Sequence, residues 1–365
     1  MDYAQAGVNL DLGNTASQIL YNASKLTWKN RKGLLGDVTE IFEDFSGLRA
    51  INVGSLAPET FMNINFDGIG TKVEIAERVA KHDTVAFDLF AMVCDDAIVR
   101  GAEPVLVGSI LDVKTLGQKN ENYIEFVKQL AKGYINAAEA ARVAVINGEV
   151  AELGHRINGF GEFNYNWGAG VVWFAKKERL FTGTDIKEGD YLVGLEEKGF
   201  RSNGLSIVRR ILEEKIGKNW HEDKKLAESI LTPSTIYSKA VVDMFGGYCF
   251  EPKIRIKAFA HITGGGIPEK LGRVLKPSGL GAEISEPFDY PKIVAEIKEL
   301  GNVSAEEAYR TWNMGQGGII ITNQPDEAIS IAKKHGIKAK IIGKTIKAET
   351  ISINSQEGKL GYKLS

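Results

Sequence analysis

The spacing of apolar residues in the first half of the chain predicts alternating strands and helices. FMNINFDGIG, following Thr60, has the pattern of a strand that runs into a tight turn, and TKVEIAERVA has helical spacing. A longer helix is predicted from Thr84 to Arg100, where GAEP ends it. VLVGSILDV, VAVING and WGAGVVWFA are predicted strands, with the amphipathic helix ENYIEFVKQLAKGYINAAEAA between the first two.

The second half repeats this mixture after a stretch rich in turn residues, 176–189. DYLVGLEE, AFAHI, GGIIIT and AKIIGKT are predicted strands, and GLSIVRRILEEKIG and PSTIYSKAVVDMF are predicted helices. We therefore predict an α+β protein of two α/β-type domains with mixed sheets, residues 1–175 and residues 176–365.

The predicted helix 84–100 carries acids among large apolar residues. Asp88 and Asp95 are seven residues apart and share a face, while Asp96 lies about 100° round the helix. A solvated acidic face is one explanation. The apolar neighbours favour burial, however, and a buried carboxylate needs a cation or strong donors. Magnesium is the natural candidate because it takes oxygen ligands.

Composition limits the class of protein. The chain has 365 residues, 45 basic and 47 acidic side chains and a net charge of -2, so it has no general attraction to nucleic acid or an anionic membrane. Its two cysteines suggest neither a disulfide framework nor a zinc site. The sequence lacks a secretory leader pattern and any long apolar span, and we expect a cytoplasmic enzyme. The 40 glycines cluster, which suggests backbone held close to a ligand.

Two acidic motifs could hold a metal and a phosphate. In NFDGIGTK, Asp67 could bind a cation while the backbone of Gly68 and Gly70, followed by Thr71 and Lys72, meets phosphate oxygens; an ordinary turn is the alternative. In NGEVAELG, we expect Glu149 just past a strand end, with Glu152 three residues on, where both could reach a shared site. The alternative is an exposed loop with ordinary acids.

Three further motifs could bind an anion. In GFRSNGLSIVRR, Ser202 and Asn203 are placed to cap the next helix, and Arg201 beside a helix N-terminus could also bind an anion. AFAHITGGG exposes successive amides from Thr263 to Gly266 that suit a phosphate or an oxyanion. His261 in that motif could be an ordinary strand-end histidine or could meet the ligand. NMGQGG is a weaker glycine loop.

In order along the chain, AGVNLDLGN, DGIGTK, KHDTVAFDLFAM, GAEP, NGEVAE, RSNGLSIVR, AFAHITGGG and NMGQGG resemble the phosphoribosylformylglycinamidine cyclo-ligase (aminoimidazole ribonucleotide synthetase) family over nearly the whole length. The resemblance implies that ATP phosphorylates the amide oxygen of formylglycinamidine ribonucleotide, after which ring closure gives aminoimidazole ribonucleotide. It also implies Mg2+, and a homodimer in which the N-terminal, ATP-binding domain pairs with its twin, so that apolar residues of Thr60 to Asp67 face a partner.

The resemblance also implies site roles. Asp67, Asp96 and Glu149 would be magnesium ligands, and Lys72 and His261 catalytic residues. The ATP site would comprise Asp67, Gly68, Gly70, Thr71, Lys72, Asp96 and Glu149. The substrate site would comprise Arg201, Ser202, Asn203, Thr263, Gly264, Gly265 and Gly266.

Several residues depart from the family pattern. Asp95 stands where the family often has Asn, Arg201 where it has the His of His-Ser-Asn-Gly, and Asn147 and Val150 change the usual Gly-Gly-Glu-Thr; LGHRINGFGEF replaces a Met-Pro-Gly-Met-Tyr portion. The changes gather on the presumed substrate side. A divergent ATP-dependent kinase or synthetase of the superfamily, acting on another amide or phosphorylated amine, and a catalytically silent nucleotide-binding subunit are therefore the alternatives.

Overall fold

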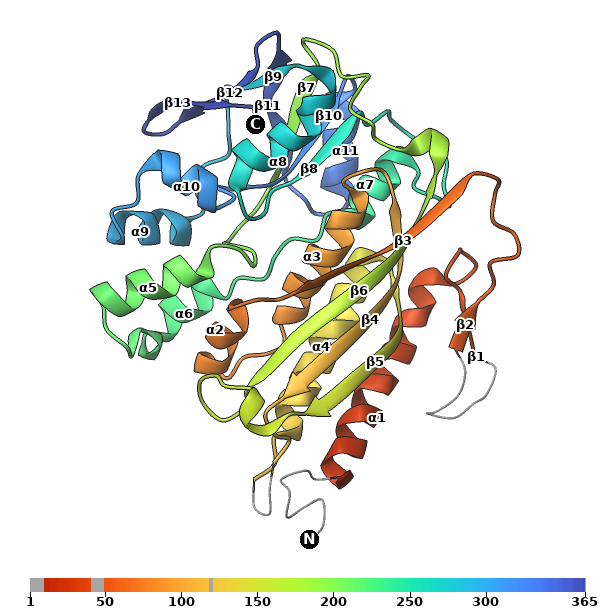
Figure 1. Cartoon of the computed structure of the whole chain (residues 1–365), viewed down its shortest axis with the longest axis vertical. Coiled ribbons are helices and arrows are strands. Elements are labelled where there is room, and N and C mark those ends of the chain that lie inside the picture. Colours follow the sequence, from red (N-terminus) through yellow and green to blue (C-terminus); the bar gives the residue numbers. More distant parts are fainter. Residues whose placement is uncertain (1–9, 41–48, 118–120, 365) are drawn as a thin grey trace. The chain divides into compact units, whose positions relative to one another are not determined.

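The computed structural model describes residues 10–40, 49–117 and 121–364. Its contacts divide the chain into two compact units (Figure 1). The first unit contains residues 1–94 and 104–174, and the second contains residues 95–103 and 175–365. Mixed helices and strands in both units confirm the predicted fold class. No helix in the described part of the chain is long and apolar enough to cross a membrane.

The first unit is built on a four-stranded sheet in the order β3-β6-β4-β5, in which β4 and β5 run parallel. Helix α1 packs against α4 and β5 (Figure 1). A separate strand pair, β1 and β2, is antiparallel. The elements that begin in this unit are α1 (Leu10–Thr27), β1 (Val38–Glu40), β2 (Arg49–Ile51), β3 (Thr60–Gly68), α2 (Lys72–Val79), α3 (Val85–Ile98), α4 (Ile124–Ala141), β5 (Ala144–Glu152) and β6 (Tyr165–Lys176). Strand β4 (Glu103–Val113) begins at the unit's edge.

The predicted strand that starts at Thr60 is confirmed as β3, and its apolar side chains are not covered. Met62, Ile64 and Phe66 are 60%, 43% and 74% exposed, and Ile110 on β4 is 57% exposed. A hydrophobic sheet face normally packs against another layer. This face therefore lacks the cover that alternating apolar residues imply.

The second unit contains a seven-stranded mixed sheet in the order β13-β12-β9-β11-β7-β10-β8. Helix α8 packs on β8 and α10, while α11 packs on α7, β7 and β11 (Figure 1). The strands are β7 (Tyr191–Glu196), β8 (Ala258–His261), β9 (Gly281–Ile284), β10 (Gln316–Thr322), β11 (Ala339–Ile346), β12 (Thr350–Ser355) and β13 (Gly358–Lys363). The helices are α5 (Leu205–Lys215), α6 (Lys224–Ile230), α7 (Ser238–Phe245), α8 (Gly266–Leu275), α9 (Lys292–Leu300), α10 (Ala305–Thr311) and α11 (Pro325–Lys334).

Strand β10 is buried along its whole length because it pairs on both sides, antiparallel with β7 and with β8. The register sets Gln316 opposite Glu196 and Gly318 opposite His261. Since the pairs are antiparallel, the carboxyl ends of β7 and β8 meet the amino end of β10. The loops at this end of the sheet carry the RSNG, HITGGG and NMGQGG motifs.

Candidate functional site

Three motif loops meet at that end of the second unit's sheet. The loop 197–204 follows β7, the loop 262–265 follows β8, and the loop 313–315 precedes β10. The buried amide of Asn313 donates to the carbonyl of Gly199 at 2.8 Å and so joins two of the loops. The structure thus brings together motifs that lie more than 100 residues apart in sequence.

Ser202 and Asn203 contribute polar atoms that have no protein partner. The Oγ of Ser202 and the Oδ1 of Asn203 are buried without a hydrogen bond among the described residues. The predicted capping role is wrong, because the N-cap of α5 is Gly204, in a left-handed conformation, and no side chain caps it. Buried polar groups are normally satisfied. Two such atoms side by side in sequence therefore suit contacts with a bound polar ligand.

The HITGGG loop leads into helix α8 through two glycines with left-handed backbone. Gly265 and Gly266 have φ of 89° and 61°. A Cβ at Gly266 would lie 1.9 Å from the carbonyl oxygen of Tyr309, so only glycine fits. The amide of Gly266 donates to Thr263 at 2.9 Å, and Gly264 lies close to the side chain of Asn203. The amino end of α8 therefore adds a partial positive charge beside the two unsatisfied oxygens.

Asp96, His261 and Arg201 form a connected chain of polar contacts. The Nδ1 of His261 is 2.7 Å from Oδ1 of Asp96, and its Nε2 is 2.8 Å from a guanidinium nitrogen of Arg201. Asp96 is half exposed, at 46% of its side chain, while the other two side chains are buried. Burial acts to raise the pKa of Asp96, but its hydrogen bond with His261 and the charges of Lys270 and Arg201 lower it below its usual value. Asp96 is therefore an ionised carboxylate that remains accessible.

The acids of helix α3 have cations supplied by the protein itself. Asp88 and Asp95 are fully buried, which excludes the solvated-face explanation for both. Asp88 accepts a hydrogen bond from the ammonium of Lys72 at 2.7 Å, and Asp95 accepts one from Arg201 at 3.1 Å. The expectation that a cation meets these acids is confirmed, although the cations are side chains. For Asp96, magnesium ligation stays a prediction.

The DGIGTK motif lies in the first unit between β3 and α2. Asp67 accepts a hydrogen bond from the amide of Gly68 at 2.7 Å. Gly70 has a φ of 69°, and Thr71 is the N-cap of α2 without a side-chain cap. Lys72 is fully buried, so the predicted contact between its ammonium and a phosphate would require the bond to Asp88 to open.

Two of the predicted magnesium ligands lie on opposite outer strands of the first unit's sheet. Asp67 is on β3, and Glu149 lies inside β5, which continues to Glu152 where the sequence predicted a loop. Two strands intervene, so roughly 14 Å separates the outer strands at about 4.8 Å per strand. Asp67 and Glu149 of the same sheet are therefore too far apart to bind one ion together. Among the described residues, no group of three His, Cys, Asp or Glu could hold a metal.

Glu149 instead lines a cavity of about 270 Å³. The cavity wall also contains Tyr21 and Arg49, whose guanidinium lies 5.2 Å above the tyrosine ring. An aromatic ring and a cation next to a carboxylate form a polar recess on this edge of the sheet. The recess is a separate feature of the first unit from the β3 to α2 turn that contains Asp67.

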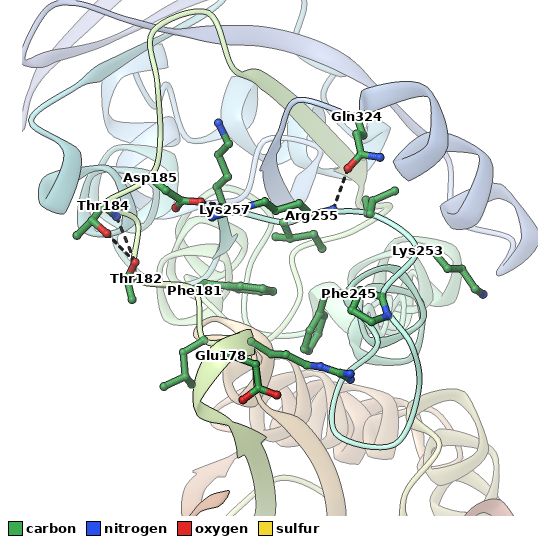
Figure 2. Close-up of a pocket in the computed structure, with 15 residues that line it drawn as sticks. Glu178, Phe181, Thr182, Thr184, Asp185, Phe245, Lys253, Arg255, Lys257 and Gln324 are labelled. Atoms are coloured by element: carbon green, nitrogen blue, oxygen red, sulfur yellow. Dashed lines mark hydrogen bonds and ion pairs between the residues drawn. The ribbon is translucent and has the colours of Figure 1, made fainter. Parts of the chain in front are cut away.

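Another cavity of the second unit, of about 480 Å³, contains no residue that the sequence predicted for the site (Figure 2). Two of its basic side chains are paired with carboxylates of the protein. Arg255 donates to Asp185 at 2.7 Å, and Lys257 donates to Asp190 at 2.6 Å. The charges of this cavity are largely compensated, so it is a weaker ligand site than the motif loops.

Sequence reasoning missed Glu197. This carboxylate is 2% exposed and accepts a hydrogen bond from Arg201 at 2.7 Å. The signal was present, because Glu197 stands four residues before Arg201 in EEKGFR. Nothing in that spacing distinguishes a buried pair from an exposed one until the β7 strand and its loop are placed.

Comparisons with known proteins agree with the arrangement of motifs. Residues 50–163 match the family described as AIR synthase related protein, N-terminal domain. Residues 187–355 match AIR synthase related protein, C-terminal domain. Similar solved structures include a hydrogenase maturation protein HypE from E. coli, with a TM-score of 0.61, 16% identity and coverage of 95% of this chain and 97% of that chain. At this identity the likeness shows the fold alone.

Curated relatives match over most of the chain. The chain is 34% identical over 359 residues to a phosphoribosylformylglycinamidine cyclo-ligase from Thermoanaerobacter sp. (strain X514), covering 96% of this chain and 98% of the relative. It is 35% identical over 306 residues to one from Methanocaldococcus jannaschii, covering 82% of each. Both family domains and both relatives support the same conclusion: this chain belongs to the phosphoribosylformylglycinamidine cyclo-ligase family.

Proposed function

We propose that the chain catalyses the ATP-dependent conversion of formylglycinamidine ribonucleotide to aminoimidazole ribonucleotide, with release of ADP and phosphate, as a step of purine synthesis in the cytoplasm. The observation that carries the proposal is the loop assembly of the second unit. It combines a glycine-rich helix start with the unsatisfied oxygens of Ser202 and Asn203. Full-length identity to named cyclo-ligases supports the same reaction.

The proposed chemistry has two steps. The amide oxygen of the substrate attacks the terminal phosphorus of ATP, and ADP leaves. The amidine nitrogen then attacks the activated carbon, the phosphate leaves with the bonding electron pair, and loss of a proton gives the imidazole ring. A hydrogenase maturation protein HypE whose structure was solved in complex with ATP (TM-score 0.54, 13% identity) shares the fold, which supports the choice of nucleotide.

In this proposal the second unit binds the substrate. The amides at the start of α8, with Thr263, meet phosphate or oxyanion oxygens, and Ser202 and Asn203 complete the contacts. In the first unit, the amides around Gly70 and Thr71 meet nucleotide phosphates at the start of α2. Lys72 joins them if it exchanges Asp88 for a phosphate.

Magnesium would neutralise the charge of the triphosphate when bound. A nucleotide-bound Mg2+ needs only one or two protein carboxylates, because water and phosphate supply its other ligands. Asp96 has the required features, since it is ionised and half exposed. Asp67 and Glu149 lie on opposite outer strands of one sheet and cannot share an ion there, so their roles as ligands stay proposals.

The uncovered sheet face supports a homodimer. Ile64, Phe66 and Ile110 line a hydrophobic groove of about 610 Å³ on the first unit. A second copy presents the same apolar face and would cover it, as two-fold symmetric interfaces are self-complementary. We expect a dimer by light scattering, and we expect Phe66→Glu to shift the mass to that of a monomer. A wild-type monomer would contradict this assembly.

The deciding experiment uses purified protein with Mg2+ and ATP, with and without formylglycinamidine ribonucleotide. We expect ADP only with the substrate, matched one to one by aminoimidazole ribonucleotide. Substrate-independent ATP binding without imidazole product would favour the second candidate, a superfamily kinase or synthetase acting on another amide or phosphorylated amine. The departures from the family pattern at Asn147, Val150 and Arg201 are the observation that keeps this candidate. Absence of ATP binding would leave a silent subunit.

A further inference from the structure

The buried cluster around Arg201 surrounds its guanidinium with two carboxylates, a backbone carbonyl and an imidazole. Arg201 follows β7, its backbone is left-handed with a φ of 59°, and its side chain is 1% exposed. A buried guanidinium is costly unless carboxylates and other acceptors surround it. All the groups that surround it belong to the second unit.

The two terminal nitrogens of Arg201 are fully engaged. One donates to Glu197 at 2.7 Å and to the carbonyl of Thr235 at 2.9 Å. The other donates to Asp95 at 3.1 Å and contacts Nε2 of His261 at 2.8 Å. Each terminal nitrogen has two hydrogens, so these four contacts use all of them. The planar guanidinium therefore cannot turn to a ligand without breaking the cluster.

The partners of Arg201 are themselves fixed. The second oxygen of Asp95, Oδ1, accepts hydrogen bonds from the amides of Tyr237 and Ser238 at 2.9 and 2.8 Å, at the start of α7. Glu197 also accepts from the amide of Thr235. Helix α3, helix α7 and the β7 loop thus hold the guanidinium in one position.

The fixed guanidinium determines which nitrogen of His261 carries hydrogen. Arginine only donates, so Nε2 of His261 must accept at 2.8 Å. In a neutral imidazole the hydrogen is then on Nδ1, which faces Oδ1 of Asp96 at 2.7 Å and donates to it. Both ring nitrogens are occupied, which leaves His261 no free nitrogen for proton exchange with a ligand.

We propose that Asp95, Glu197 and Arg201 are positioning residues that hold His261 as the Nδ1–H tautomer, so that His261 orients the accessible carboxylate of Asp96. In this role Arg201 does not contact substrate, and His261 is not an acid or base. The importance of the oriented Asp96 for turnover rests on the proposed function, whereas the tautomer does not.

The pairing of Asp95 with Arg201 supports this inference. These positions are 106 residues apart in sequence and form one ion pair at 3.1 Å. The buried cation and the buried anion therefore compensate each other.

The first test measures the tautomer directly. Ring 15N chemical shifts of 15N-histidine-labelled protein, without substrate, distinguish a protonated from an unprotonated nitrogen. The chain has five histidines, and the signals of His261 are assigned by their loss in His261→Gln. We expect a protonated Nδ1 and an unprotonated Nε2 at pH 7. Hydrogen on Nε2, or on both nitrogens, would overturn the proposal whatever the enzyme's activity.

The second test measures coupling. Asp95→Asn and Arg201→His should each lower kcat by roughly tenfold or more, and the double variant should lose clearly less than the product of the two single losses, because the two residues contact each other. If the protein turns over a different substrate, the same four proteins are compared by their stability in thermal unfolding. Arg210→Met, on an exposed arginine with 82% side-chain exposure, is the matched control and should change neither measurement. Two independent positions would give losses that multiply in kcat and add in the free energy of unfolding. That result in both cycles would refute the coupled role.

Discussion

Each unit contains a buried carboxylate of helix α3, and the two carboxylates are neutralised by different cations. In the first unit the ammonium of Lys72 meets Asp88 at 2.7 Å. In the second unit the guanidinium of Arg201 bridges Asp95, Glu197 and His261. The first uses a compact charge on a flexible stem, and the second uses a planar group with several directed donors.

This difference separates a cation that can move from one that cannot. A lysine ammonium can turn about its flexible stem and exchange one oxygen partner for another. Arg201 would lose four hydrogen bonds at once. Lys72 therefore remains the better candidate for contact with a ligand phosphate, while Arg201 is better suited to orienting its neighbours.

Removing each cation tests the contrast by stability. Arg201→Met leaves both Asp95 and Glu197 without their cation and should lower the free energy of unfolding by about 4–5 kcal/mol. Lys72→Met leaves one buried carboxylate, Asp88, without its cation and should lower the free energy of unfolding by about 3 kcal/mol. Urea denaturation measures both. Equal losses, or a larger loss for Lys72→Met, would contradict the view that the guanidinium cluster is the more interlocked of the two.

Much of the fold followed from local pattern. The period of apolar residues predicted β3, α2 and α3 to within a few residues. The acids of α3 were correctly predicted to be buried, at Asp88 and Asp95, since their neighbours leave the helix little polar surface.

The remaining features depend on contacts distant in sequence. Glu149 was predicted beyond a strand end, yet β5 continues through it because the parallel partner β4 extends equally far. Ser202 was predicted as a cap, yet Gly204 takes that place with a left-handed backbone. The partner of Asp95 is 106 residues away, and no local pattern indicates which cation it meets.

Backbone crowding in the second unit gives a further test. Gly266→Ala should lower the free energy of unfolding by about 3–4 kcal/mol, because it combines a positive φ with a Cβ only 1.9 Å from Tyr309 O. Gly279→Ala is the matched control, with a φ of 68° and nothing within 4 Å, and should cost about 1 kcal/mol. Similar losses in thermal or urea unfolding would mean that the loop moves aside and does not hold a rigid ligand site.

The unsatisfied oxygen of Ser202 separates binding from stability. Ser202→Ala removes a buried hydroxyl that has no protein partner, so unfolding should change by less than about 0.5 kcal/mol. If that hydroxyl meets the substrate, KM for formylglycinamidine ribonucleotide should rise roughly tenfold, the equivalent of about 1.4 kcal/mol. Steady-state kinetics beside urea denaturation measure the two effects. An unchanged KM would remove Ser202 from the substrate site.

Glu77 in the first unit is a third buried carboxylate, and its hydrogen bonds come chiefly from backbone amides. It accepts hydrogen bonds from the amides of Phe160 and Tyr165 at 2.9 and 3.1 Å. Burial raises its pKa from 4.5 to about 7, although these two hydrogen bonds act to lower it. Between those values the folded state retains a proton that the unfolded chain has lost, so stability falls as pH rises from 4.5 to 7.

Replacing this carboxyl group should remove its share of the pH dependence. Glu77→Gln cannot titrate, and relative to wild type it should gain about 3 kcal/mol in the free energy of unfolding between pH 4.5 and pH 8. Glu74→Gln, on the same helix and paired with Arg78 at 2.8 Å, is the control and should show no such gain. Urea denaturation at several pH values measures the difference. Parallel wild-type and Glu77→Gln curves would mean that two amide donors compensate a buried carboxylate as fully as a lysine or an arginine does.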